Sequence, residues 1–379
     1  MKLIQKLKEI WSIEELRQRI LLTIGLIVIY RLGTYITLPG IDPTALENIK
    51  TQGSSGILGL VNLFAGGAFA RASVFALGIM PYISASIAIQ LLTIAIPYFQ
   101  KLQKEGESGR KKINQITRWL TVIITAFQAP GYIVNLRSQV PGAIISISNP
   151  EIVSPFQFWF TSIVILVAGT LFVMWLGEKI TDKGIGNGIS LIIMIGIIAR
   201  LPASFRDEVA SRVNQGGGLV VLLLELVALA AVIAFVILLV QGTRRIPVNF
   251  AKKIVGNKQY GGVRQYIPLK VNAAGVMPII FAQAIMFIPA TIAQFFPDAS
   301  ASQSILTTFG NYTSFWYNFV FASLIILFTY FYTAIAVNPN QMADDMKRNN
   351  GFIPGVKPGR STADFIDEVM SRITLPGAI

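Results

Sequence analysis

Apolar residues in this chain are gathered into runs of about 20 residues, separated by shorter stretches that hold most of the charged side chains. A helix needs about 20 apolar residues to cross the roughly 30 Å hydrocarbon core of a bilayer. A new apolar run at Ile373 indicates the start of a ninth span shortly before Ile379. We therefore expect an all-α polytopic membrane protein. The pattern predicts eight complete spans, at about 20–38, 75–98, 119–135, 156–176, 189–201, 219–240, 273–296 and 315–337.

The stretch 57–99 is apolar almost throughout, but it is too long for one span. A helix of about 40 residues would be roughly 60 Å long, which is twice the thickness of the hydrocarbon core. The Gly66-Gly67 pair and Pro81 interrupt it, so we expect a half-helix up to about Ala70 and then a full span. Irregular backbone at membrane depth is tolerated only inside protein or beside water. The short piece is therefore either buried in the bundle or a re-entrant or interfacial segment that only packs.

A polar loop at 202–218 divides the chain into an N-terminal half, 1–201, and a C-terminal half, 219–379. The first half holds five predicted spans, and the second holds three with the start of another. Residues 1–19 form an amphipathic, basic segment that is typical of a helix lying at a membrane surface.

The net positive charge is confined to one set of segments. They hold 25 of the 32 basic and 12 of the 19 acidic residues, and so carry the whole net charge of +13. Because Lys and Arg are retained on the cytoplasmic side, we expect these segments and the N-terminus in the cytoplasm. The segments are 1–19, 101–118, 177–188, 241–270 and 338–372.

The segment 241–270 carries more charge than orientation needs, with seven basic residues and no acidic one. Such a long basic loop suits an anionic partner: RNA, an acidic protein or lipid headgroups. The alternative is that it serves only as a topology signal that also contacts headgroups. No motif that reads bases is visible in it.

Composition excludes several chemistries. The chain has no Cys and no His, so it lacks thiolates and the commonest metal ligand and general base. It also lacks the GxxxxGK[ST] phosphate loop. Polar residues within the predicted spans are few, and for any single one a helix–helix hydrogen bond is the favoured explanation. They are Arg31 and Glu225 near the outer surface, and Ser84, Ser86, Gln90, Gln128 and Gln283.

Five blocks of sequence are highly specific. They are FARASVFALGIMPYISASIAIQLLT (69–93), KEGESGRKKINQ (104–115), MWLGEKITDKGIGNGISLII (174–193), PLKVNAAGVMPIIFA (268–282) and GFIPGVKPGRSTADFI (351–366). These blocks resemble the SecY family, the central channel subunits of the bacterial Sec protein translocon, and the resemblance spans the chain from the first span to its end.

The resemblance implies a ten-span bundle of two inverted five-span halves, hinged near 202–218. It implies a plug at 57–71 that closes an external funnel, and a lateral gate between spans 2 and 3 on one side and spans 7 and 8 on the other. The plug would include Leu60, Asn62, Phe64, Gly66, Gly67 and Arg71. The apolar pore ring would be formed by Ile79, Ile83, Ile189, Ile193 and Ile280. The lateral gate would use Ser84, Gln90, Gln128 and Gln283.

The resemblance also implies partners and a location. We expect a multi-pass protein of the bacterial inner membrane that binds the ribosome, the SecA ATPase, SecE and SecG-like small subunits, signal-bearing polypeptides and membrane lipid. Lys357 stands where the family usually has Arg, which keeps the charge but loses the bidentate fork. The family's ninth and tenth spans are missing, so this chain alone is not expected to form a sealed channel. The docking residues would be Arg244, Arg245, Lys252, Lys253, Lys270, Lys357 and Arg360.

Two classes of function fit this picture. A passive protein-conducting channel needs no catalytic residue or cofactor, because an apolar ring closes a pore by dewetting. A secondary transporter of a small solute also suits inverted repeats and a broken helix. The near absence of buried titratable groups and the basic loop favour the channel. An intramembrane protease would need a Ser–His pair, an Asp dyad or HExxH, and the chain has none of these.

Overall fold

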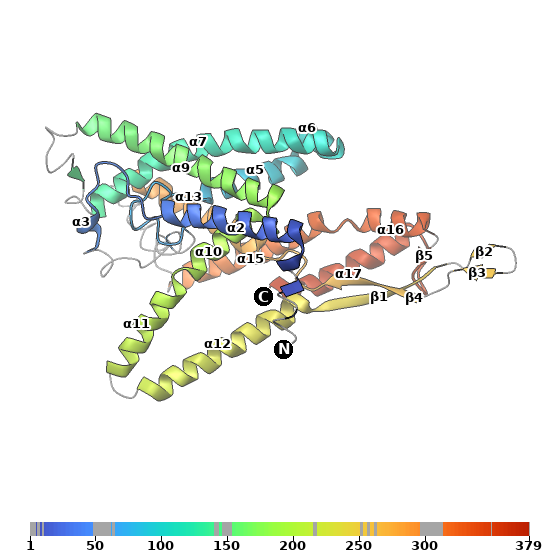
Figure 1. The fold of residues 1–379 in the computed structure, drawn as a ribbon. Helices are drawn as coiled ribbons and strands as arrows, with labels where there is room; N and C mark the ends of the chain where they lie inside the picture. The colour runs from blue at the N-terminus through green and yellow to red at the C-terminus, as the bar shows by residue number, and fades with distance from the viewer. Residues whose placement is uncertain are drawn as a thin grey trace. The chain divides into compact units, whose positions relative to one another are not determined.

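The chain divides into two compact units. Unit 1 comprises Met1–Glu208 and Ala284–Tyr317, and unit 2 comprises Val209–Gln283 and Asn318–Ile379. Figure 1 labels the helices and strands of the chain. The computed structural model describes residues 5, 8–9, 11–47, 62, 65–139, 144–145, 154–214, 218–250, 253–255, 258–260, 264–295, 314–349 and 351–378.

Long helices dominate unit 1. They are α2 (Glu14–Gly33), α5 (Met80–Ala95), α7 (Glu107–Gln139), α9 (Pro155–Lys183) and α10 (Gly188–Ile198), with the shorter α3 (Pro43–Glu47) and α6 (Pro97–Lys104). Helix α7 packs on α5, α6 and α9, and α9 also contacts α2 and α10. Leu166, Val173, Leu176 and Ile180 lie along α9 and are fully buried. Helix α9 is therefore central to the core of this unit.

The span predicted at 75–98 is wrong in its boundaries. Residues 74–79 form turns, and α5 begins only at Met80, with Pro81 in its first turn. Gly78 has a φ of +55°, a left-handed conformation that ends any helix arriving from the N-terminal side. A second break at Ile96 bends α6 away from α5 by 101°.

Other predicted boundaries were too conservative, because the helices continue past their apolar runs. Helix α2 begins at Glu14, within the segment predicted to lie on the surface, and α7 begins at Glu107, within the predicted basic loop 101–118. The predicted polar loop 202–218 is largely helical as α11 (Leu201–Asn214). Polar residues with good helix propensity extend a helix as readily as apolar ones do.

A tight hairpin joins α9 to α10. The side chain of Asn187 accepts a hydrogen bond from the Ser190 N–H and caps α10. The Gly188 N–H donates to the Thr181 hydroxyl at 2.9 Å. A Cβ at Gly188 would lie 2.1 Å from the Gly177 carbonyl oxygen, so only glycine allows this close approach.

Unit 2 combines helices with a small sheet. Its helices are α12 (Gly218–Gln241), α16 (Pro339–Arg348) and α17 (Arg360–Ala378), with most of α15 (Phe315–Ala336) and the first part of α13 (Met277–Phe295). The strands are β1 (Thr243–Phe250), β2 (Lys253–Val255), β3 (Lys258–Tyr260), β4 (Arg264–Lys270) and β5 (Gly351–Phe352).

The sheet has the order β4-β1-β5 and is antiparallel throughout. In the β1–β4 pair Arg245 lies opposite Pro268 and Pro247 lies opposite Tyr266. The Val271 N–H donates to the Gly242 carbonyl at 3.0 Å and closes the ladder at its helix-proximal end. Strands β2 and β3 form a separate two-stranded ribbon.

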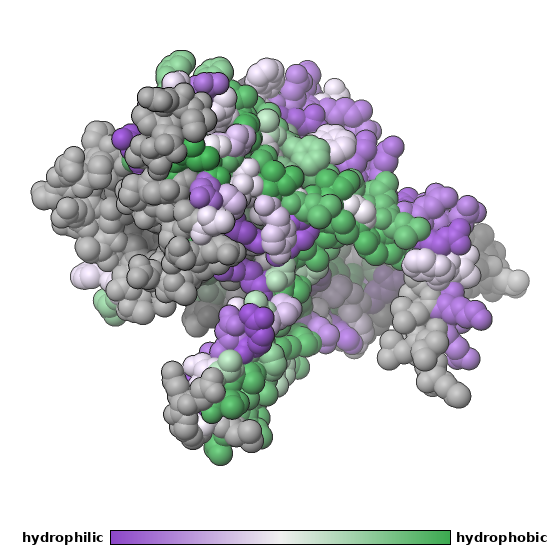
Figure 2. Space-filling model, turned by 60° about the vertical axis from the view of Figure 1, so that its left-hand side comes forward, coloured by the Kyte–Doolittle hydropathy of each residue, from purple (hydrophilic) through white to green (hydrophobic). Residues whose placement is uncertain are grey.

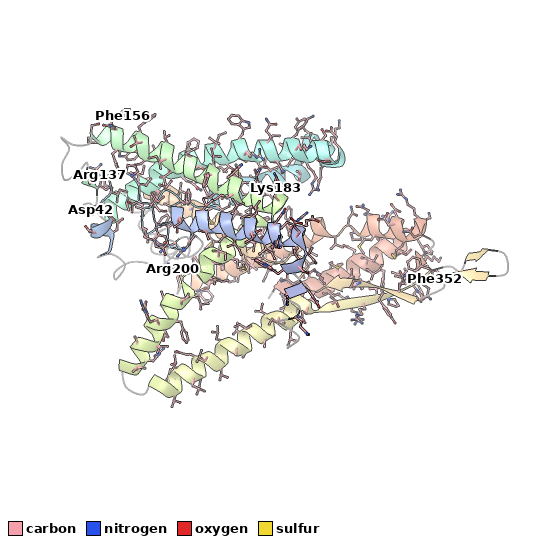
Figure 3. The ribbon with its side chains drawn as sticks, viewed as in Figure 1. Asp42, Arg137, Phe156, Lys183, Arg200 and Phe352 are labelled. Carbon is pink, nitrogen blue, oxygen red and sulfur yellow. The ribbon has the colours of Figure 1, made fainter. Side chains whose placement is uncertain are left out.

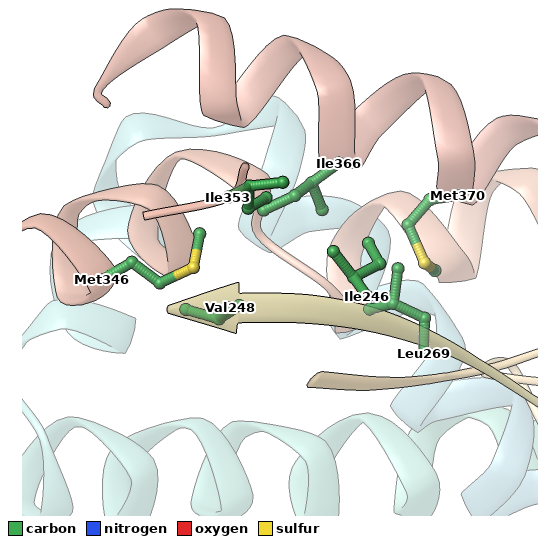
Figure 4. Close-up of a cluster of buried hydrophobic side chains, with 7 residues drawn as sticks. All are labelled: Ile246, Val248, Leu269, Met346, Ile353, Ile366 and Met370. Carbon is green, nitrogen blue, oxygen red and sulfur yellow. The ribbon is translucent and has the colours of Figure 1, made fainter. Parts of the chain in front are cut away.

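One hydrophobic core joins this sheet to α16 and α17 (Figure 4). Ile246, Val248 and Leu269 contribute from the sheet. The other members are Met346, Ile353, Ile366 and Met370. Residues 241–270 were predicted as a basic loop and residues 338–372 as a separate cytoplasmic segment. The two therefore fold together as one module, which we call the strand–helix module. The all-α prediction is wrong here, although the chain as a whole is mostly helical.

Apolar side chains cover broad areas of the exposed surface (Figure 2). Among the described residues, five helical stretches are long and apolar enough to cross a membrane, or six if the bent pair α5–α6 is one span. None of the apolar window of α12 is buried, as expected for a helix that faces lipid. The predicted start of a ninth span at Ile373 falls inside α17, and the count of eight complete spans stays a prediction.

Candidate functional site

The predicted plug leads into a compact, turn-rich segment in unit 1. Its base is fixed to the chain that follows α2, since the Leu38 N–H donates to the Ala72 carbonyl at 2.8 Å. The Val74 N–H donates to the Ile36 carbonyl at 2.9 Å, and Thr37 and Ser73 form an antiparallel bridge. Two residues of the predicted plug, Leu60 and Phe64, lie outside the described residues.

Two arginines hold the Gly66 carbonyl. Arg31 on α2 donates to it from Nη1 at 2.9 Å, and Arg71 donates from Nη2 at 2.8 Å. The guanidinium carbons of Arg71 and Arg31 lie 4.2 and 5.1 Å from the centre of the Tyr35 ring, within the range of cation–π attraction. We call Arg31, Tyr35, Gly66 and Arg71 the arginine latch. Its contacts tie the plug to the end of α2.

A buried tyrosine on α7 holds the plug from another side. The Tyr132 hydroxyl donates to the Phe69 carbonyl at 2.8 Å, and the two rings meet edge to face at 4.8 Å. Only 4% of Tyr132 is exposed. Within the plug, the Asn62 side chain accepts a hydrogen bond from the Ala70 N–H at 3.0 Å.

Gly66 also makes a close backbone contact. Its φ is +64°, and a Cβ there would lie 3.1 Å from Cα of Gly196 on α10. Both the conformation and the space therefore require glycine at this position. The plug is thus wedged among α2, α7 and α10, all of which belong to unit 1.

Sequence reasoning missed several of these contacts. Arg31 was interpreted as a residue that reaches the membrane surface, whereas its guanidinium binds the plug backbone. Tyr35 and Gly196 gave no distinguishing signal. Tyr132 did give one, because a tyrosine within an apolar span needs a partner for its hydroxyl.

The predicted pore-ring residues lie at helix starts. Ile79 is the N-cap of α5, Ile83 follows one turn later, and both are buried. Ile193 on α10 is buried as well, while Ile189 packs beside Gly177 of α9. Ile280 lies near the start of α13 in unit 2. The ring itself stays a prediction.

The predicted lateral-gate residues differ in how well they are satisfied. The Ser84 hydroxyl bonds to the Met80 carbonyl within α5, and Gln90 makes a long 3.5 Å contact with the Ser86 hydroxyl. Among the described residues, Gln128 Oε1 on α7 and Gln283 Nε2 on α13 are buried without a hydrogen-bond partner. A buried amide group left unpaired costs about 1–3 kcal/mol. Nδ2 of Asn62 and the hydroxyls of Ser162 and Thr170 on α9 are unpaired as well, so this property is not particular to the predicted gate.

The predicted docking residues gather on the strand–helix module. Arg244 and Arg245 are exposed, and as neighbours on β1 they point to opposite faces of the sheet. Lys270, Lys357 and Arg360 are exposed too. Phe352, an exposed aromatic residue at β5 (Figure 3), was not predicted. Lys252 lies outside the described residues, and only the backbone of Lys253 is described, in β2.

Apolar spanning helices around a wedged, non-helical segment define the class: a multi-pass membrane channel. The SecY family model matches residues 73–379. The chain is 46% identical over 368 residues to the protein translocase subunit SecY of Escherichia coli strain K12, covering 96% of this chain and 82% of that one. The chain therefore belongs to the SecY family of protein-conducting channels, which are not enzymes.

Solved structures support the fold at low sequence identity. The idle yeast Ssh1 complex bound to the 80S ribosome matches with a TM-score of 0.64 and 16% identity, covering 96% of this chain and 82% of that one. A SecY structure whose plug domain stabilises the closed state of the translocation channel matches with a TM-score of 0.62 and 16% identity, covering 96% and 83%. The turn-rich segment with its glycines therefore belongs to a fold in which a plug has been described.

Proposed function

We propose that this chain forms a passive pore through which unfolded polypeptides cross the membrane and from which apolar segments leave sideways into lipid. The observation that carries the proposal is the wedged plug with its polar, reversible ties. The driving energy comes from a docked partner, because the sequence has no nucleotide-binding loop.

The plug, residues 57–71, closes the resting pore. Its ties are few and break without covalent change: the arginine latch, the Tyr132 hydroxyl bond and the backbone contact of Gly66 with Gly196. A hydrogen bond involving a charged group contributes about 1.5–3 kcal/mol net. A handful of such contacts keeps a plug closed at rest and still lets an entering chain displace it.

The pore narrows at a ring of Ile79, Ile83, Ile189, Ile193 and Ile280. Branched apolar side chains offer no hydrogen bond to a passing polypeptide and exclude water when no chain is present. Ser84, Gln90, Gln128 and Gln283 form the polar part of the lateral gate. Gln128 and Gln283 each bury one amide atom that has no hydrogen-bond partner among the described residues, which is compatible with a polar seam.

The architecture is two inverted halves, 1–201 and 219–379, hinged at 202–218, with eight complete spans and the start of a ninth. The membrane is the bacterial inner membrane, with the N-terminus in the cytoplasm. The charge pattern supports this orientation, because the whole net charge of +13 lies in the segments that share the N-terminal side.

The strand–helix module docks cytoplasmic partners. The yeast Ssh1 relative was solved on a ribosome, and we propose the ribosome and SecA as partners here, with SecE and SecG-like subunits beside the bundle. The exposed residues that carry this role are Arg244, Arg245, Lys270, Lys357 and Arg360, together with Lys252 and Lys253.

A disulfide tests whether the plug moves. A Cβ at Gly78 would lie 3.7 Å from Cβ of Ala65, which is within the range for a disulfide. The variant Ala65→Cys/Gly78→Cys is expected to crosslink at rest, to block translocation while oxidised and to recover on reduction. The pair Thr37→Cys/Ser73→Cys, at the base of the plug, is the control and should crosslink without blocking. Full translocation through the oxidised Ala65–Gly78 variant contradicts the proposal.

A further inference from the structure

Three arginines from three parts of unit 1 lie close together beside the plug. Arg31 is on α2, Arg71 belongs to the plug, and Arg200 lies where α10 passes into α11 (Figure 3). Arg200 follows Gly196 by one helical turn, and Gly196 contacts Gly66, whose carbonyl binds the other two arginines. Arg200 is near enough to Arg71 and Arg31 for their charges to repel its own.

This cluster has no acidic partner among the described residues. Other arginines do find one: Arg118 makes a two-pronged contact with Glu178 at 3.0 and 2.7 Å, and Arg19 pairs with Glu15 at 2.7 Å. A guanidinium has five N–H donors. Arg31 uses donors on Gly66 and Tyr35, and Arg71 uses donors on Gly66 and Gly67. Several donors remain, and three like charges without an anion are costly.

The surroundings identify the kind of anion. Exposed apolar side chains flank the cluster: Leu32 and Ile36 follow Arg31, and Ile198 and Leu201 lie on either side of Arg200. Leu32 is 62% exposed and Leu201 is 60% exposed, as expected where acyl chains cover a helix. The arginine N–H donors lie at the end of an exposed apolar surface. A phospholipid fits this arrangement better than a free ion, because its headgroup binds the donors while its hydrocarbon tails cover the apolar side chains.

We propose that Arg31, Arg71 and Arg200 bind the phosphate group of an anionic phospholipid, and that this lipid holds the plug closed. A phosphate accepts paired hydrogen bonds from arginine forks, so one headgroup would connect α2, the plug and α10. It would also remove the repulsion among the three charges. The effect on the plug rests on the proposed function, and the binding site does not.

The test uses the full chain, purified with its partner subunits, in bilayer discs of phosphatidylcholine with or without phosphatidylglycerol. Native mass spectrometry counts the phosphatidylglycerol molecules retained. In Arg200→Gln the most tightly bound phosphatidylglycerol is expected to bind about tenfold more weakly, because charge-assisted hydrogen bonds are lost. Arg200→Lys keeps the charge but not the paired N–H donors, so its retention of phosphatidylglycerol should lie between that of the parent chain and that of Arg200→Gln. This variant tests the proposal if Arg200→Gln does not fold. Arg206→Gln, at an exposed arginine on α11 that pairs with Asp207, should match the parent chain.

The outcomes separate the two proposals. Equal retention by the parent, Arg200→Gln and Arg200→Lys chains overturns the site. If inorganic phosphate alone binds and its binding depends on Arg200 in the same way, the lipid assignment is overturned. It is also overturned if the chain retains the lipid only after the partner subunits are removed. The rate at which the Ala65–Gly78 disulfide forms reports the plug. It should rise with phosphatidylglycerol in the parent and not in Arg200→Gln. Retention that depends on Arg200 while translocation proceeds through the oxidised disulfide leaves the site standing and overturns only the plug mechanism.

Discussion

Tyr132 offers the sharpest single-atom perturbation of the plug. Tyr132→Phe removes the hydroxyl that donates to the Phe69 carbonyl at 2.8 Å and keeps the ring that meets Phe69 edge to face at 4.8 Å. The site is buried, so no bulk water replaces the lost donor while the plug is closed. When the plug opens, the Phe69 carbonyl meets water, and the cost therefore falls on the closed state alone.

The size of the effect follows from that asymmetry. The Phe69 carbonyl keeps a second, longer hydrogen bond from the Ala72 N–H at 3.3 Å, so the variant loses the net contribution of one hydrogen bond, about 0.5–1.5 kcal/mol. Since about 1.4 kcal/mol is a factor of ten in an equilibrium constant, the open fraction should rise by about fivefold, within a range of roughly 2- to 13-fold. The ring contact, worth about 0.5–1.5 kcal/mol, is retained.

Cysteine labelling measures the open fraction directly, because the chain has no natural cysteine. Ala68 is fully buried in the closed plug, so Ala68→Cys reacts with a membrane-impermeant maleimide only when the plug opens. Tyr132→Phe should speed this labelling about fivefold. Tyr98→Phe removes the same hydroxyl from an exposed ring on α6 and should leave the rate unchanged. Equal rates in the two variants would refute the reasoning.

Three further predictions concern the ring, the module and the core. Ile83→Asn should fold normally and leak ions from resting vesicles, since water in the pore hydrates the amide; tight vesicles with an earlier melting transition would show that Ile83 is ordinary core. Arg245→Glu should weaken ribosome binding at low salt and less at high salt, where the attraction is screened, and unchanged low-salt binding would reduce the loop to a topology signal. Gly188→Ala should lower the melting temperature by placing a Cβ 2.1 Å from the Gly177 carbonyl, a strain of about 1–3 kcal/mol, whereas Gly25→Ala, with nothing within 4 Å, should not.

The apolar runs predicted most of the helices, because burial in lipid depends on local composition. They could not predict helix ends, since Glu107 and Lys183 extend α7 and α9 beyond the apolar part without any change in periodicity. The sheet was missed for a different reason. The alternating apolar residues Ile246 and Val248 make only a short strand pattern, and Pro247 lies between them. The strand is also paired with β5, which lies about 100 residues later in the chain, so local sequence does not predict the sheet.

The candidate site shows the same limit. Glycines and an arginine are the residues on which the predicted plug rests, but the atoms that Arg31 and Tyr132 bind are backbone carbonyls of Gly66 and Phe69. Every residue has such a carbonyl, so the sequence carries no sign of which one is the acceptor. Contacts of this kind become visible only when the fold brings the segments together.

The two prolines of the sheet limit how the strand–helix module can bind. The Val271–Gly242 hydrogen bond sets the alternation of the ladder, because every second pair counted from it is hydrogen-bonded. Pro247 and Pro268 lie at odd offsets from this bond and so fall in the pairs between, whose N–H positions face away from the partner strand. Each strand therefore lacks one N–H donor in the middle of its outward edge. On β1 the missing donor is at Pro247, outside the two residues that pair with β5, and on β4 it is at Pro268, along the unpaired side. An incoming strand could not form a continuous ladder at either edge. A partner must instead recognise the side chains of the module, so changes of surface charge should alter its binding and a competing β-strand peptide should not.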